Sequence, residues 1–154
     1  MDKKVMGIIA VVVIAIIACF ALGIGSNQVG YKTFEFEGCT LELPADTVVN
    51  NQTEDISNMK VFVYEMNSSS TSTSSTLRVV SDPNLGNSSE DYINRYGDQD
   101  KKVESYKDKW VILHDTPGDK KYVALLIEDG HGYSISNDNL DTLKQMVDTF
   151  KLKK

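Results

Sequence analysis

The sequence contains few of the residues from which small proteins build cofactor, metal or nucleophile sites. Its two cysteines, Cys19 and Cys39, lie in separate parts of the chain, so they form no internal disulfide framework. There is no phosphate-binding glycine loop, no zinc-ligand spacing and no Gly-x-Ser-x-Gly elbow. We therefore expect no cofactor, no metal and no enzymatic activity, and we expect Cys39 to be a small buried residue on a strand.

Positive charge is also in short supply outside the first few residues. The chain has 22 acidic and 16 basic side chains, and leaving out Asp2, Lys3 and Lys4 leaves 21 and 14, a net charge of −7 for the remainder. An acidic domain repels phosphate backbones. We therefore expect no nucleic-acid partner.

Charge is wholly absent from Val5 to Gly25. As a helix these 21 residues would span about 31 Å, close to the ~30 Å hydrocarbon core of a bilayer and longer than the apolar core of a removable signal peptide. Lys3 and Lys4 precede the run, which predicts a cytoplasmic amino terminus. The expected order is a cytoplasmic segment at 1–4, a signal-anchor helix in the cell membrane at 5–25, a stalk at 26–32 and an extracytoplasmic domain at 33–154.

Cys19 has three interpretations within this run. Ile16-Ile17-Ala18-Cys19 is similar to a lipobox, which would make the chain a lipoprotein anchored through Cys19, but apolar residues continue after the cysteine where a polar tether is usual. Cys19 can instead fill an apolar position of the helix. It can also belong to a helix-packing stripe with Ala15 and Gly23, since small residues four apart allow close approach of membrane helices and so a homodimer. Apolar length favours the spanning helix.

Three Asn-x-Ser/Thr triplets provide candidate N-glycosylation sites in the predicted outer domain. They begin at Asn51, Asn67 and Asn87. Each falls in a segment that the sequence predicts to be a loop, where a modifying enzyme has access.

Alternating apolar residues and turn signals predict mainly short antiparallel strands. Residues 45–58 are polar and indicate a loop, and NSSSTSTSST at 67–76 is typical of a flexible hairpin tip. Strands are expected at 33–37, 39–43, 59–66, 76–81, 103–106, 110–114, 122–127 and 133–136.

Two helices complete the expected fold. Ser88 can cap a helix at 89–96 that Gly97 ends, and Asp138 can cap a second helix from Asn139 to about Phe150. The second helix has an apolar stripe for packing on a sheet. The class is therefore α+β, with an antiparallel sheet of about seven strands, one short helix and a C-terminal amphipathic helix packed on the sheet. The stripe consists of Leu140, Leu143, Val147 and Phe150, with Met146 beside it.

The order of elements resembles a known type of domain. "FEFEGCTLELP" (34–44) is similar to the paired opening strands of PsbP/Mog1-like α+β domains, and "YVALLIEDGHGYSISNDNLDTLKQMVDTF" (122–150) to their closing hairpin and helix. This resemblance implies an accessory or binding role and supplies no catalytic residue. The whole chain also resembles the small single-anchor surface proteins of methanogenic archaea.

The two histidines are the remaining candidates for chemistry. His114 ends an expected strand next to Asp115, and His131 lies between two glycines in an expected turn. Catalysis requires a converging set of groups, which neither neighbourhood supplies. We therefore expect a non-enzymatic module that binds an unknown partner protein, envelope polymer or small ligand. The alternative is a small extracytoplasmic hydrolase that uses His114 with acidic neighbours.

Overall fold

The structure is a computed structural model that describes residues 30–97, 102–116 and 120–154. Residues Tyr31–Lys154 form one compact unit. The predicted membrane helix at 5–25, with Ala15, Cys19 and Gly23, lies outside the described residues. Within the described ranges, none of the helices combines the length and apolarity that a membrane crossing requires.

The opening alternation of apolar and polar residues forms a hairpin of β1 (Tyr31–Phe36) and β2 (Cys39–Pro44). Gly38 turns the chain between them with a φ of +68°, a conformation that glycine adopts without strain. The two-residue β10 (Lys151–Leu152) pairs with the other edge of β2, giving the order β1-β2-β10. As predicted, Cys39 is fully buried on a strand, and its burial raises the pKa of the thiol to about 12.

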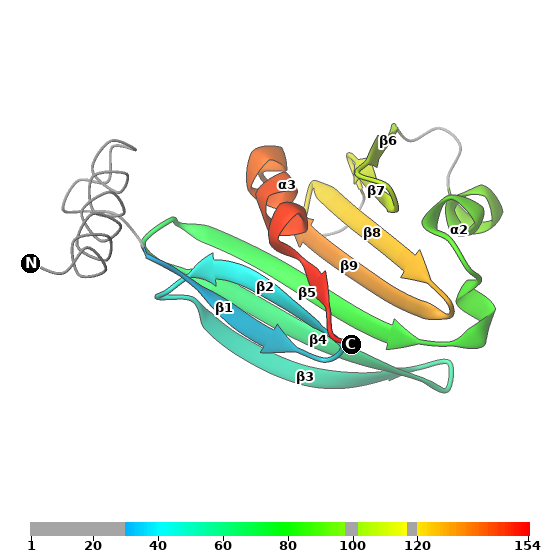
Figure 1. Cartoon of the computed structure of the whole chain (residues 1–154), viewed down its shortest axis with the longest axis horizontal. Coiled ribbons are helices and arrows are strands. Elements are labelled where there is room, and N and C mark those ends of the chain that lie inside the picture. The colour runs from blue at the N-terminus through cyan, green and yellow to red at the C-terminus, as the bar shows by residue number, and fades with distance from the viewer. Residues whose placement is uncertain (1–29, 98–101, 117–119) are drawn as a thin grey trace, which may run out of the picture. The chain divides into compact units, whose positions relative to one another are not determined.

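The main sheet has seven strands, and every neighbouring pair is antiparallel (Figure 1). β7 and β8 have buried residues on both faces, which agrees with the prediction of a covered central strand at 122–127. The order across the sheet is β3 (Val48–Ile56), β4 (Met59–Ser68), β5 (Thr73–Ser81), β9 (His131–Asn137), β8 (Tyr122–Glu128), β7 (Trp110–His114) and β6 (Val103–Tyr106).

Both predicted helices are present. The Ser88 hydroxyl accepts from the amide of Asp91 at the start of α2 (Ser89–Tyr96). The second helix, α3 (Leu140–Thr149), is capped by the side chain of Asn139 rather than by the predicted Asp138. Asp138 instead accepts from the amide of Lys121. The short 3₁₀ helix η1 (Pro83–Leu85) follows β5.

The core lies against one face of the main sheet, which both α3 and the small sheet cover (Figure 1). Leu143, Met146 and Val147 of the predicted stripe are buried there. Phe150 follows α3 and packs edge-on against Trp110 and Tyr133, with ring centroids 4.9 and 5.3 Å away. The apolar spacing of the C-terminal segment therefore predicted its packing face correctly.

The predicted loop at 45–58 is wrong, because most of it is the nine-residue strand β3. β3 pairs along its whole length with β4, and Ser57 and Asn58 connect the two strands with φ values of 50° and 66°. Such a two-residue turn suits a hairpin but usually contains glycine. The predicted antiparallel sheet of about seven strands is confirmed, but β3 is one of its strands, and the expected strands at 33–37 and 39–43 form a separate sheet as β1 and β2.

The Ser/Thr-rich segment is a hairpin tip, as predicted, but only Ser69–Ser72 separate the two strands. The Asp46 carboxylate holds this tip by accepting from the hydroxyls of Ser68 and Ser70, both at 2.7 Å, and from the Ser70 amide at 2.9 Å. These hydrogen bonds hold the pKa of Asp46 well below its usual range. One carboxylate thus helps to order the tip of this polar segment.

Removing that carboxylate is expected to loosen the tip without unfolding the domain. In Asp46→Ala, the amide of Ser70 should exchange with solvent faster, because its acceptor is gone. Native-state hydrogen exchange measures this change. Asp55→Ala, which removes an exposed carboxylate from β3, is the control and should leave the exchange of Ser70 unchanged. Unchanged exchange in Asp46→Ala would contradict the role assigned to Asp46.

Candidate functional site

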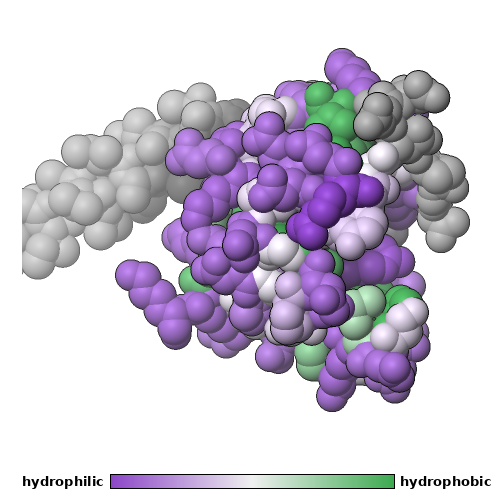
Figure 2. All heavy atoms as spheres, turned by 90° about the vertical axis from the view of Figure 1, so that its right-hand side faces the viewer, coloured by the Kyte–Doolittle hydropathy of each residue, from purple (hydrophilic) through white to green (hydrophobic). Residues whose placement is uncertain are grey.

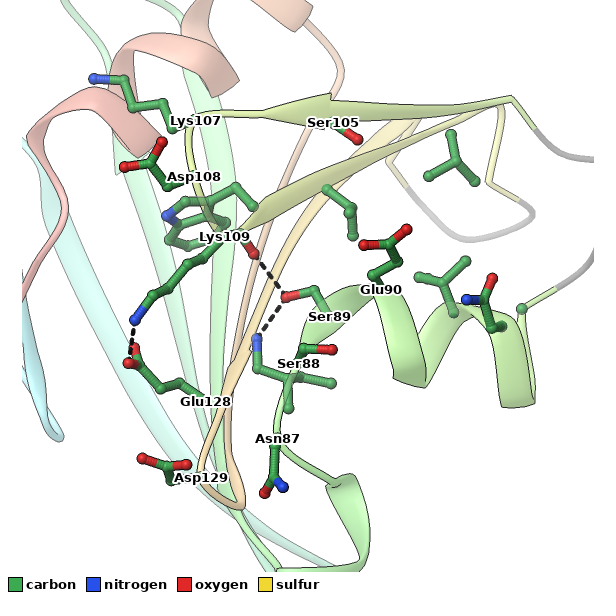
Figure 3. A pocket seen from close by; sticks show the side chains of 17 residues that line it. Asn87, Ser88, Ser89, Glu90, Ser105, Lys107, Asp108, Lys109, Glu128 and Asp129 are labelled. Atoms are coloured by element: carbon green, nitrogen blue, oxygen red, sulfur yellow. Dashed lines mark hydrogen bonds and ion pairs between the residues drawn. The ribbon is translucent and has the colours of Figure 1, made fainter.

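A cleft with a volume of about 540 Å³ lies between α2 and the β6–β7 hairpin (Figure 3). It opens on the face of the main sheet opposite α3, because Val111 lines it while its neighbour Ile112 belongs to the core under α3. We call it the α2 cleft.

Ser89 fixes the position of α2 beside this cleft. Its side chain is buried, and its hydroxyl donates to the carbonyl of Lys109 at 2.9 Å while accepting from the amide of Ile127 at 2.8 Å (Figure 3). One hydroxyl therefore joins the start of α2 to β8 and to the residue that precedes β7. Leaving such buried backbone groups without partners would cost about 1–3 kcal/mol each.

The α2 cleft combines apolar and polar groups in the way that ligand sites usually do. Figure 2 views this end of the molecule and shows that its described residues are mainly hydrophilic, with apolar residues in small separate patches. The apolar lining residues are Ile93, Val103, Trp110, Val111 and Ile127; the polar ones are Asn87, Ser88, Ser89, Glu90, Asn94, Ser105, Lys107, Asp108, Lys109, Glu128 and Asp129, and Gly97 completes the lining.

The electrostatics of the α2 cleft favour positive charge. Lys109 forms an ion pair with Glu128, which raises the pKa of Lys109. Figure 3 places Glu90 on the side of α2 that faces the β6–β7 hairpin. Among the described residues, Glu90, Asp108 and Asp129 form no ion pair. The lining has four carboxylates (Glu90, Asp108, Glu128 and Asp129) against two ammonium groups (Lys107 and Lys109), and the resulting net charge of −2 attracts a cationic group.

His114 lies on the opposite face of the sheet from the α2 cleft. Its Nε2 is 3.0 Å from Oε2 of Glu104, whose Oε1 accepts from Nζ of Lys144 on α3 at 2.6 Å. The hydrogen bond from Lys144, followed by that with His114, lowers the pKa of Glu104. The imidazole is buried and packs edge-on against Tyr122. The acidic neighbour of His114 is thus Glu104 rather than Asp115, and the cluster joins β6 and β7 to α3.

His131 lines a second cleft, of about 660 Å³, between the β1–β2 turn and β4, β5 and β9. Its Nδ1 lies 3.1 Å from the backbone carbonyl oxygen of Asp129. Glu37 and Glu128 also line this cleft, as do Lys60 and Lys153. The two histidines are therefore in separate places, and neither lines the α2 cleft.

The three candidate glycosylation sites are exposed but differ in surroundings. Asn51 and Asn67 are on strands β3 and β4 rather than in the predicted loops, and Asn87 lies in the predicted loop before α2. The third residue of the Asn87 triplet is the buried Ser89, so an enzyme acting on the folded domain cannot reach that hydroxyl. Thr53, in the Asn51 triplet, is exposed.

No protein-family model and no curated protein matches this chain in sequence. Sequence reasoning found Ser88 as a helix cap and thereby placed α2, but it did not identify Ser89, Glu90, Lys109 or Glu128 as neighbours. Ser89 and Glu90 lie on α2 itself, and only the pairing of β6, β7 and β8 brings Lys109 and Glu128 beside them.

The Glu104 cluster should make folding stability depend on pH. Because the folded-state pKa of Glu104 is lowered from its ordinary value of 4.5, its contribution is complete above that value and is lost as the pH falls through the lower one. Glu104→Gln should reduce the free energy of unfolding by about 1–2 kcal/mol at neutral pH. Denaturant titrations from neutral to acidic pH should show the difference from wild type shrinking below the ordinary pKa. Glu65→Gln, at an exposed position on β4, is the control. If the difference in unfolding free energy between Glu104→Gln and wild type did not change with pH, the role assigned to Glu104 would be contradicted.

Proposed function

We propose that this chain is a non-enzymatic binding module on the outer face of a cell membrane and that its ligand occupies the α2 cleft. The observation that carries the proposal is the cleft itself, with an apolar floor and three carboxylates that form no ion pair among the described residues. Its volume of about 540 Å³ lies in the range of small-ligand sites.

The ligand should carry a cationic group beside an apolar portion, as a lysine or arginine side chain of a partner protein does. The apolar portion would pack on Val111 and Ile127, while the cation would lie near Glu90 and Asp108. A long basic side chain covers apolar surface with its methylene groups and keeps its charge at a polar rim. This match of shapes and charges favours a basic peptide segment over an anionic polymer.

Binding accounts for the α2 cleft better than catalysis. Neither histidine lines it, and the Ser89 hydroxyl is occupied by two backbone partners. The hydrolase alternative is supported by one observation, the 3.0 Å contact of His114 with Glu104, and a structural role explains this contact because both oxygens of Glu104 have partners. His114→Ala in a broad hydrolase screen tests the alternative.

The proposed location depends on the apolar run at 5–25 and on Lys3 and Lys4 before it. A spanning helix would hold the domain outside the membrane, and an intact amino terminus in a mass spectrum would exclude lipidation of Cys19. The resemblance to PsbP/Mog1-like domains adds an accessory role to the same proposal.

Binding can be measured with short capped peptides that differ at one residue. Peptides centred on Lys or Arg should perturb amide signals of the α2 cleft in the full chain in detergent, whereas peptides centred on Glu should not. Glu90→Gln and Asp108→Asn should each weaken binding by about 2–5-fold, since each removes one attractive charge. Asp91→Asn, one residue along α2 and outside the lining, is the control.

A filled cleft provides the opposite test. Ser105 lines the α2 cleft from β6, and Ser105→Trp should fill the floor and abolish the perturbation by basic peptides. Ser74→Trp, at an exposed position on β5, is the matched control. Unchanged binding by Ser105→Trp would show that the peptides bind elsewhere.

A further inference from the structure

One edge of the main sheet is long and is not blocked by lysine, proline or a bulge. β3 forms the outer strand of the sheet, and among the described strands it pairs with β4 alone (Figure 1). It has nine residues, whereas β6 at the opposite edge has four. Every second residue of an outer strand directs its amide and carbonyl away from the sheet, where they can pair with another strand.

Proteins usually prevent such pairing with lysine, proline or a bulge in the edge strand. β3 (VVNNQTEDI) contains no lysine and no proline, and its register with β4 is continuous from Val48 to Ile56. It also exposes two large apolar side chains, with 61% of Val48 and 47% of Ile56 accessible to solvent. An exposed edge of this kind is suited to pairing with a second strand.

The sequence of β3 is complementary to itself. We propose that two copies of this chain pair through β3 in an antiparallel register centred on Gln52. In that register Val48 faces Ile56 of the second copy, Asn50 faces Glu54, and Gln52 faces Gln52. Antiparallel partners lie on one face, so both exposed apolar residues of each chain gain an apolar neighbour. The two seven-stranded sheets would form one continuous sheet.

Charge favours the same register. The acidic residues Glu54 and Asp55 occupy only the second half of β3, so the antiparallel arrangement places them opposite the uncharged half of the second copy. Glu54 of one chain lies four residues along the strand from Glu54 of the other, about 13 Å away at strand spacing. That distance exceeds the screening length of about 8 Å at physiological ionic strength, so repulsion is small. A parallel in-register pair would instead place like charges side by side.

The dimer should be weak, because one pair of nine-residue strands buries less than the roughly 1,200 Å² typical of stable interfaces. Asn51 lies at the centre of β3 and begins one of the Asn-x-Ser/Thr triplets. A glycan on Asn51 would crowd Thr53 of the second copy, so glycosylation of Asn51 and dimer formation should exclude each other.

Site-directed disulfide formation tests both the dimer and its register. The full chain is used in detergent with Cys19→Ser, since Cys39 is fully buried. Gln52→Cys should give a disulfide-linked dimer on mild oxidation, because the two Cα atoms would lie within the range of about 4.4–6.8 Å that a disulfide bridges. Asn50→Cys alone should give none, but mixing it with Glu54→Cys should give the mixed dimer.

Asn50→Cys is the control for Gln52→Cys, because both variants keep residues 5–25. A dimer formed through residues 5–25 alone would therefore give no more disulfide at position 52 than at position 50. Adding Val48→Asp and Ile56→Asp to Gln52→Cys should abolish the linked dimer, because two carboxylates then face each other at both ends. Val48→Lys with Ile56→Asp should restore it. Equal cross-linking at 50 and 52, or none at either, would overturn the proposal. A mixed disulfide of Gln52→Cys with an unrelated membrane protein in place of the dimer would assign the edge to a different partner.

Discussion

The fold depends on covering one apolar face of the main sheet. α3 and the β1-β2-β10 sheet together cover this face. The chain connects them directly, since β10 follows α3 and pairs with β2. Leu143 on α3 and Leu41 on β2 are both fully buried. Burial of each such side chain stabilises the fold by about 1.5–3 kcal/mol. Phe150 at the junction packs on Trp110 and Tyr133. Because the last turn of α3 leads into a strand, the helix and the small sheet hold each other in place.

The other face of the main sheet is covered differently, and the candidate site arises from that difference. α2 is short, and its two buried backbone connections pass through the hydroxyl of Ser89 rather than through an apolar stripe. A helix held by one polar anchor leaves space beside itself, and the α2 cleft occupies this space. The ion clusters on the far side of β6 have a contrasting role, because Glu104 and Tyr106 bind Lys144 and Asp148 of α3 and thereby fix the sheet edge.

Sequence patterns predicted the parts of the fold in which apolar residues decide the structure. The alternation in β1 and β2, the apolar runs of β7 and β8 and the stripe of α3 all mark buried faces, and all three predictions are confirmed. The patterns failed where hydrogen bonds decide. β3 is polar because its pairing with β4 uses backbone groups, and Ser57-Asn58 lacks the glycine of a typical hairpin signal. The carboxylate of Asp46 orders Ser68–Ser70, which lie 22 to 24 residues later in the sequence. The composition of residues 67–76 alone therefore could not predict this contact.

The polar composition of β3 explains why the sequence did not predict this strand, and it also bears on the role of its free edge. An inner strand of a sheet is identified by the apolar residues that it buries, and once both of its edges are paired it has no further backbone groups to offer. An outer strand needs few apolar residues, so Val48 and Ile56, placed symmetrically about Gln52, are not required by the core. Two large apolar side chains that the fold does not bury carry a hydration cost that a second strand in this register would remove. The symmetric apolar ends of this polar outer strand are therefore the feature that the proposed contact between chains explains.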